Sequence, residues 1–194
     1  MSRRLSLLTA AVCVVFSATS SAVWAQNYPT KDIKLQVPFA PGGNTDMLAR
    51  LIGQELAKTL GQPVVVENVL GANGSIGASR VASASNDGHT LLFGTAGTQA
   101  INPSIYKNLG EKNLEDFEYI ALVTSIPNVL VINEANLQVK SVSELVTAAR
   151  QRSIGMSYGS PGTGSTVHLS GELFKSSSRL DLAHVPYKGS LQAT

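Results

Sequence analysis

The fold prediction starts from residues 33–43, which read Ile33-Lys34-Leu35-Gln36-Val37-Pro38-Phe39-Ala40-Pro41-Gly42-Gly43. The first five residues alternate apolar and polar side chains, as in a β-strand, and the two prolines end that strand. The two glycines allow a tight loop, and Asn44 or Thr45 is expected to cap the helix that follows. Apolar residues recur at helical spacing over 48–60, and Gly61 stands where a helix-ending residue is favoured.

The same alternation continues after this helix. The run Val64–Val66 is continuously β-branched, which predicts a strand buried on both faces. A second glycine turn at 71–74 precedes a helix of small residues, and Thr90–Phe93 predicts a third strand. Strands and helices that alternate through short loops predict a parallel sheet with helices on both faces. In such sheets, ligands bind at the carboxyl ends of the strands.

A second α/β series follows. Two apolar runs at 120–123 and 129–132 are expected to be strands, and Ser141 with Glu144 forms a capping box before a helix. Residues 156–158 predict a strand that opens into the loop Gly159-Ser160-Pro161-Gly162-Thr163-Gly164-Ser165-Thr166. We predict a first α/β lobe over 26–125 and the start of a second over 126–194, with the crossing near 122–130.

The first 25 residues indicate export. Arg3 and Arg4 precede an apolar run that is shorter than a membrane span, and small residues follow up to Ala25. We predict a cleaved signal peptide over 1–25, by the general or the twin-arginine route, and a periplasmic product.

Composition narrows the function classes further. The 194 residues include 15 Lys and Arg and 13 Asp and Glu, and 43% are hydrophobic, which excludes a disordered chain. Without Arg3 and Arg4 the two charge counts become equal at 13, and the single cysteine, Cys13, also lies in the signal segment. The expected exported chain therefore has no thiol chemistry and no broad basic surface for nucleic acid.

Two glycine loops are the strongest candidates for chemistry. The loop over 159–166 has the frame of a phosphate-binding P-loop, but Ser165 stands where that motif needs lysine. A glycine loop at a helix start still offers free backbone N–H groups and a positive dipole, which suit a carboxylate. The loop over 39–44 repeats this design. Together the two loops could hold the ends of a dicarboxylate across a cleft, or each could be an ordinary capped helix start.

Several polar residues leave alternatives open. Asp46 can complement the helix dipole or accept from a ligand amine. Ser165 and His168 could form the nucleophile pair of an exported hydrolase, although a third catalytic residue is not evident. His168 could equally pack or bond the loop, and His89 is expected to be exposed. The three histidines do not cluster at metal-ligand spacing.

An ordered set of motifs spans the chain expected after cleavage, from Tyr28-Pro29 through Val37–Gly43, Asp87–Leu92 and Asn102-Pro103 to Tyr158-Gly159-Ser160 and His184–Gly189. This set closely resembles the Bug-type periplasmic solute receptors of tripartite tricarboxylate transporters. The resemblance implies a type II periplasmic-binding-protein-like α/β fold, with two lobes that each have a central sheet flanked by helices. It also implies a receptor without catalysis or cofactor, a monomer that captures a small carboxylate and delivers it to membrane permease subunits.

In this family the ligand is held by the two glycine loops, through backbone amides, hydroxyls and bridging waters. Tricarboxylates, dicarboxylates, amino acids and aromatic acids all fit this reading. The resemblance also implies that members continue past the point where this chain ends, so we expect the 194-residue chain to be C-terminally truncated and not competent as a receptor. The expected ligand-binding residues are Phe39, Ala40, Pro41, Gly42, Gly43, Asn44, Asp46, Thr95, Ser160, Thr163, Gly164, Ser165, Thr166 and His168.

Overall fold

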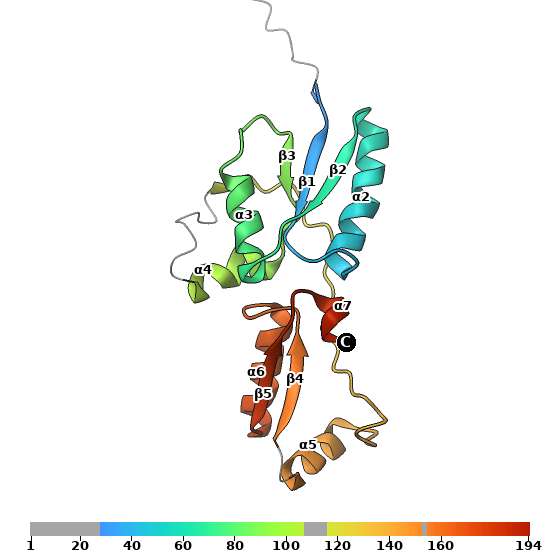
Figure 1. Ribbon diagram of the computed structural model, residues 1–194, viewed down its shortest axis with the longest axis vertical. Coiled ribbons are helices and arrows are strands. Elements are labelled where there is room, and N and C mark those ends of the chain that lie inside the picture. Colours follow the sequence, from blue (N-terminus) through green and yellow to red (C-terminus); the bar gives the residue numbers. More distant parts are fainter. Residues whose placement is uncertain (1–27, 107–115, 153–154) are drawn as a thin grey trace, which may run out of the picture.

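The computed structural model describes residues 28–106, 116–152 and 155–194 (Figure 1). The predicted signal segment over 1–25 lies outside these ranges. The described chain forms two α/β units, each with its own parallel sheet. Within the described ranges, each helix is too short or too polar to cross a membrane.

The first unit contains a three-stranded sheet with the order β2-β1-β3. Its elements are β1 (Ile33–Val37), α2 (Asn44–Leu60), β2 (Val64–Asn68), a 3-10 turn (Ala72–Gly74), α3 (Ser75–Ala82) and β3 (Thr90–Leu92). Strand β1 pairs in parallel with both neighbours, so the predicted parallel arrangement is confirmed. Figure 1 shows α2 and α3 flanking this sheet. A π-helical turn (Gly97–Ile101) and α4 (Asn102–Ile105) follow.

The core of the first unit lies between β1 and α2. Leu35, Val37 and Ala49 are buried together, and the side chains of β2 pack against them. Helix α2 approaches the sheet closely at Gly53, where an added Cβ would lie 3.3 Å from Val64. At its end, Gly61 adopts the left-handed conformation (φ 68°) and donates to the Ala57 carbonyl, as its position in the sequence predicts.

Strand β2 differs from the prediction. It lies at the edge of the described sheet, and Val65 is 43% exposed, so the run Val64–Val66 is not buried on both faces. Three consecutive β-branched residues predict a strand correctly, but burial of both faces needs a covering layer on each face. Val64 and Val66 pack against the core, whereas Val65, on the opposite face of the strand, is left partly exposed.

The second unit contains α5 (Val142–Gln151), β4 (Met156–Ser160), α6 (Thr166–Ser178), β5 (Leu182–Pro186) and the short α7 (Ser190–Ala193). Strands β4 and β5 pair in parallel. The predicted cap at Ser141 is confirmed, because Ser141 Oγ accepts from the Glu144 N–H at 3.2 Å. The reciprocal bond of a capping box is displaced by one residue: the Glu144 carboxylate accepts from the N–H of Lys140, which precedes the cap, at 2.8 Å.

The two apolar runs at 120–123 and 129–132 are not strands, which corrects the prediction. Residues 117–132 are an extended connection that leads from the first unit towards α5 (Figure 1). Leu122 is 88% exposed and Val129 is 76% exposed. A strand needs a neighbour to satisfy its backbone groups, and in the described chain none is hydrogen-bonded alongside this segment.

The expectation that His89 is exposed is also wrong. The residue is only 7% exposed, and its Nε2 accepts from the Thr30 N–H at 3.1 Å. The ring also packs edge-on against Tyr28, with centroids 5.1 Å apart. The His89 side chain, in the turn before β3, is therefore not solvated but holds the segment that leads into β1 at Thr30.

Candidate functional site

The first glycine loop connects β1 to α2, and its glycines set the chain direction. Gly42 has a φ of +82°, in the left-handed region that favours glycine, and Gly43 is extended. The helix begins at Asn44, and Gly43 takes the N-cap position without a side-chain hydrogen bond. The predicted cap at Asn44 or Thr45 is therefore wrong, because both residues are already helical. The first N–H groups of a helix have no acceptor within it.

The Asp46 carboxylate holds this loop in place. Asp46 is 3% exposed, and its Oδ2 accepts from the Gly42 N–H at 2.9 Å. Arg50 Nε and Nη2 donate to the two carboxylate oxygens at 2.9 and 3.0 Å. Asn68 Nδ2 donates both to Asp46 Oδ1 and to the Phe39 carbonyl, each at 2.9 Å. The Arg50 guanidinium lowers the pKa of Asp46 to about 2, against the opposing effect of burial.

The second glycine loop connects β4 to α6. Gly162 and Gly164 have φ values of +146° and +88°, so both positions are strained for residues other than glycine. Ser165 is the N-cap of α6, and its Oγ accepts from the His168 N–H at 3.1 Å. The loop is closed by a bond from the Ser165 N–H to the Gly162 carbonyl at 3.1 Å.

Three ring side chains, those of Tyr158, His168 and His184, pack together beside the second glycine loop. His184 Nε2 lies 2.6 Å from Ser160 Oγ, and Ser160 is fully buried. The His184 ring contacts the rings of His168 and Tyr158, with centroids 4.1 and 5.0 Å apart. Burial lowers the pKa of His184. The Tyr158 hydroxyl donates to Glu172 at 2.6 Å, which fixes the base of the cluster.

The hydrolase alternative finds no support in this geometry. Ser165 Oγ is engaged as the helix cap, and His168 Nδ1 accepts from the Gly164 N–H at 3.2 Å. Both groups therefore serve the loop and are not arranged as a nucleophile and its base. The loop-bonding role considered for His168 is confirmed. Among the described residues, His, Cys, Asp and Glu form no group that could hold a metal ion.

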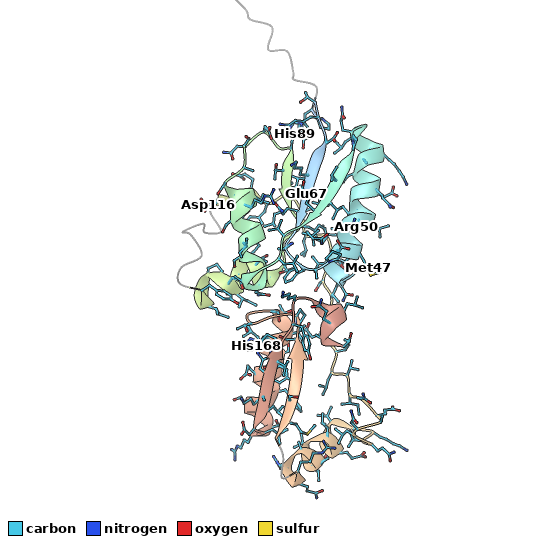
Figure 2. All side chains as sticks on the ribbon, viewed as in Figure 1. Met47, Arg50, Glu67, His89, Asp116 and His168 are labelled. Atoms are coloured by element: carbon cyan, nitrogen blue, oxygen red, sulfur yellow. The ribbon has the colours of Figure 1, made fainter. Side chains whose placement is uncertain are left out.

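The two units meet at the second loop. The Tyr106 hydroxyl donates to the Thr163 carbonyl at 3.0 Å. Asn73 and Asn102 are joined by a 2.9 Å hydrogen bond, and a Cβ at Gly164 would lie 3.0 Å from Asn102 Oδ1. In Figure 2, His168 lies at the end of the second unit that faces the first. The glycines of this loop thus permit close contact between the units.

Both loops line one groove with a volume of about 1410 Å³. This exceeds the roughly 300–1,000 Å³ of a small-ligand pocket, because the groove also runs along the extended segment 116–126. Of the predicted ligand-binding residues, those that line the groove are Phe39, Ala40, Gly43, Asn44, Thr95, Ser165 and Thr166. The others, which do not line it, are Pro41, Gly42, Asp46, Ser160, Thr163, Gly164 and His168.

Residue-level reasoning missed four side chains that place the loops. They are Asn73, Asn102, Tyr106 and His184. Asn73 adopts the left-handed conformation (φ 50°), which asparagine tolerates better than most residues. An asparagine directly before Gly74 in a glycine turn was the signal available for it.

Comparisons with known proteins agree on one family of transport receptors. A family model described as the tripartite tricarboxylate transporter family receptor, TctC, matches residues 48–194. Protein BugT of Bordetella pertussis is 37% identical over 184 residues, which cover 93% of this chain and 56% of BugT. The chain spans about half the length of the curated relatives it matches.

Two solved structures from Rhodopseudomonas palustris are also similar to this chain. Rpa4515 with adipate has a TM-score of 0.82 and 42% identity, covering 86% of this chain and 55% of that one. MatC with bound malate has a TM-score of 0.77 and 37% identity, covering 86% and 57%. The solved structures include periplasmic binding proteins, so the predicted fold class is confirmed.

Proposed function

The chain belongs to the tripartite tricarboxylate transporter receptor family, and we propose that it forms the carboxylate-binding part of a periplasmic solute receptor. The observation that carries the proposal is the shared groove: the starts of α2 and α6, with their glycine loops, line the same cavity. Each helix start presents unpaired N–H groups and the positive end of a helix dipole.

The proposed ligand is a small dicarboxylate whose two ends are held at the two helix starts. The first loop, from Phe39 to Asn44, binds one carboxylate, and the second, around Ser165 and Thr166, binds the other. Thr95 lines the wall between them. Adipate in Rpa4515 and malate in MatC are ligands of this class in similar proteins.

We extend the proposal to the rest of the chain, with the family membership as its support. Residues 1–25 act as a cleaved signal that sends the chain to the periplasm, residues 26–125 form the first lobe, and residues 126–194 belong to the second. The receptor works as a monomer, closes its lobes on the ligand and passes it to the membrane permease subunits of its transporter, without a chemical step. Nucleic acid plays no part in this function.

The test is a titration of the purified protein with adipate and malate, followed by amide NMR. We expect saturable shifts at the N–H groups of Asn44, Thr45 and Thr166, a result that would overturn the expectation from the sequence that the 194-residue chain is not competent as a receptor. The matched control ligand is 1,6-hexanediol, which has the chain length of adipate but no carboxylate, and it should leave these amides unshifted. Equal shifts with the diol, or shifts confined to residues outside the two loops, would rule out carboxylate capture by this groove.

A further inference from the structure

The turn between β2 and α3 brings one side chain of the first unit, that of Asn73, up to the second glycine loop. A Cβ placed at Gly162 would lie 3.5 Å from Asn73 Oδ1, and a Cβ placed at Gly164 would lie 3.2 Å from Asn73 Nδ2. In Figure 1 the start of α3 and the nearby α4 lie at the end of the first unit that faces the second. The Asn73 amide is therefore next to the main chain of a loop that belongs to the other unit.

The turn that carries Asn73 is held in an unusual backbone conformation. Ala72 and Asn73 are both left-handed, with φ values of 46° and 50°. Residues persist in this region where their surroundings fix them, and they are frequent at functional sites. Asn102, which is 2% exposed, fixes the turn, because its Nδ2 donates to the Asn73 carbonyl at 2.9 Å and to Ser75 Oγ at 2.7 Å. The Asn73 side chain thus extends from a firmly held support.

The contacts of Asn102 also decide which way the Asn73 amide points. A carbonyl can only accept, so the Asn102 atom that faces it is Nδ2, and Asn102 Oδ1 is the acceptor on the other side. This Oδ1 accepts from Asn73 Nδ2 at 2.9 Å. Asn73 Oδ1 is buried, and no group among the described residues donates to it. A buried acceptor without a donor is unfavourable, so an arrangement that supplies a donor is favoured.

The second glycine loop offers one main-chain donor. Its engaged N–H groups bond within the loop or to the adjoining His168, and they belong to Gly162, Gly164 and Ser165. Pro161 carries no N–H. Over 161–165, in the part of the chain that the structure describes, the N–H of Thr163 is left without an acceptor. The Thr163 carbonyl already accepts from Tyr106 of the first unit at 3.0 Å.

Resting on the function proposed above, we propose that Asn73 is a latch between the two units: when they close further on a bound carboxylate, Asn73 Oδ1 accepts from the Thr163 N–H. Tyr106 and Asn73 then hold the carbonyl and the N–H of the same residue. Neither Asn73 nor Thr163 lines the groove, so neither contacts the ligand. Asn73 is a positioning residue, and it favours the closed arrangement because its buried acceptor is satisfied only there.

The experiment is amide hydrogen exchange of the purified protein, followed by NMR with and without saturating adipate. We expect the Thr163 N–H to exchange several-fold more slowly when adipate is bound, because it gains an acceptor. Thr163 does not line the groove, so direct cover by the ligand does not account for this protection.

A variant tests whether Asn73 provides the acceptor. Asn73→Gly removes the amide and keeps a residue that readily adopts the left-handed conformation. Adipate should bind to it roughly 2- to 12-fold more weakly, the change that follows from losing one neutral hydrogen bond. It should also no longer slow exchange at Thr163.

The kinetics separate a latch from a general structural defect. The weaker binding of Asn73→Gly should arise from faster dissociation of adipate at an unchanged association rate, because the latch forms after capture. Damage to the binding loops would slow association as well. The matched control is Asn136→Gly, which replaces an exposed asparagine in the turn before α5, away from the groove, and it should behave like the wild type.

The outcomes are distinct. If the wild type does not bind adipate or malate, the proposed function fails, and the latch fails with it. If adipate binds but exchange at Thr163 is as fast as in the free protein, the function stands and the latch is overturned. Wild-type affinity and kinetics in Asn73→Gly would overturn it too. The wild-type exchange measurement decides the matter even where the variant does not fold.

Discussion

Replacing Asn44 by proline removes one proposed ligand donor while keeping the helix. Asn44 is the first residue of α2, where the N–H has no acceptor within the helix and proline is well tolerated. The preceding Gly43 has φ −77° and ψ 167°, an extended conformation that a following proline accepts. Asn44 itself is exposed, so its side chain can change without disturbing the core.

The magnitude follows from the bond that is lost. A hydrogen bond from an N–H group to a carboxylate contributes about 1.5–3 kcal/mol. Asn44→Pro should therefore weaken binding of the dicarboxylate roughly 10- to 150-fold. A water bridging the N–H and the ligand would be lost as well, since proline cannot donate.

The matched control is Asn44→Ala, which removes the side chain but keeps the N–H. Calorimetric titration with adipate should give nearly wild-type affinity for the alanine variant and the stated loss for the proline variant. Circular dichroism should show that both variants keep their helix content. The same pair at the start of α6, Thr166→Pro and Thr166→Ala, tests the second loop, because Ser165 there is also extended (φ −70°, ψ 158°). Equal affinities for the proline and alanine variants at both positions would refute main-chain capture of the ligand.

Three further changes test the framework of the site. Gly171→Ala should lower the free energy of unfolding by about 1–3 kcal/mol, because the added Cβ would overlap the Tyr158 ring. The control is Gly155→Ala, which has open space around it and should leave this free energy unchanged. Urea denaturation measures both variants. Tyr106→Phe removes the 3.0 Å hydrogen bond to the Thr163 carbonyl, which contributes about 1 kcal/mol. We expect adipate to bind several-fold more weakly to this variant, while its melting temperature changes little. Burial holds the pKa of His184 below its usual value of 6.5, so the unfolded chain binds the proton more readily and stability falls as the pH drops below 6.5. His184→Asn should show a flatter dependence of unfolding free energy on pH than the wild type, and an identical slope would contradict this role.

The parts of the fold that sequence reasoning predicted correctly depend on local signals. The alternation over 33–37, the left-handed Gly61 and the capping box at Ser141 and Glu144 each involve neighbours within a few residues. The structure confirms the strand at 33–37, although Gln36 is buried with its apolar neighbours, and it confirms the left-handed Gly61 and the cap at Ser141. Periodicity and capping are short-range effects, so a single sequence carries them.

The errors arise where distant residues decide the outcome. Asn44 and Thr45 are good capping residues, so local signals predict the cap of α2 there. Asn68 and Arg50 instead hold Asp46 against Gly42, and the cap falls at Gly43. His89 was expected to be exposed, but Thr30, 59 residues away, donates to its ring. The runs at 120–123 and 129–132 are apolar enough for strands, yet a strand also needs a partner, which composition does not reveal.

At the site, too, local signals predict some features and distant contacts decide others. The distant contacts change which groups are expected to bind the ligand. The two glycine loops were found from sequence because glycine spacing before a helix is a local signal. Yet the polar side chains counted as ligand groups, Asp46, Ser160 and Ser165, are engaged in holding the loops in shape.

On the function proposed above, the main anchors for a carboxylate are the main-chain N–H groups at the two helix starts, which recognise the carboxylate and not the rest of the ligand. Discrimination among carboxylates therefore falls to two features: the spacing between the starts of α2 and α6, and the side chains that line the groove between them, such as Phe39, Thr95 and Val167. A receptor built in this way can change its ligand by substitutions along the groove while both anion-binding loops stay the same. That separation of anchoring from selection is consistent with similar proteins that hold ligands as different in length as malate and adipate.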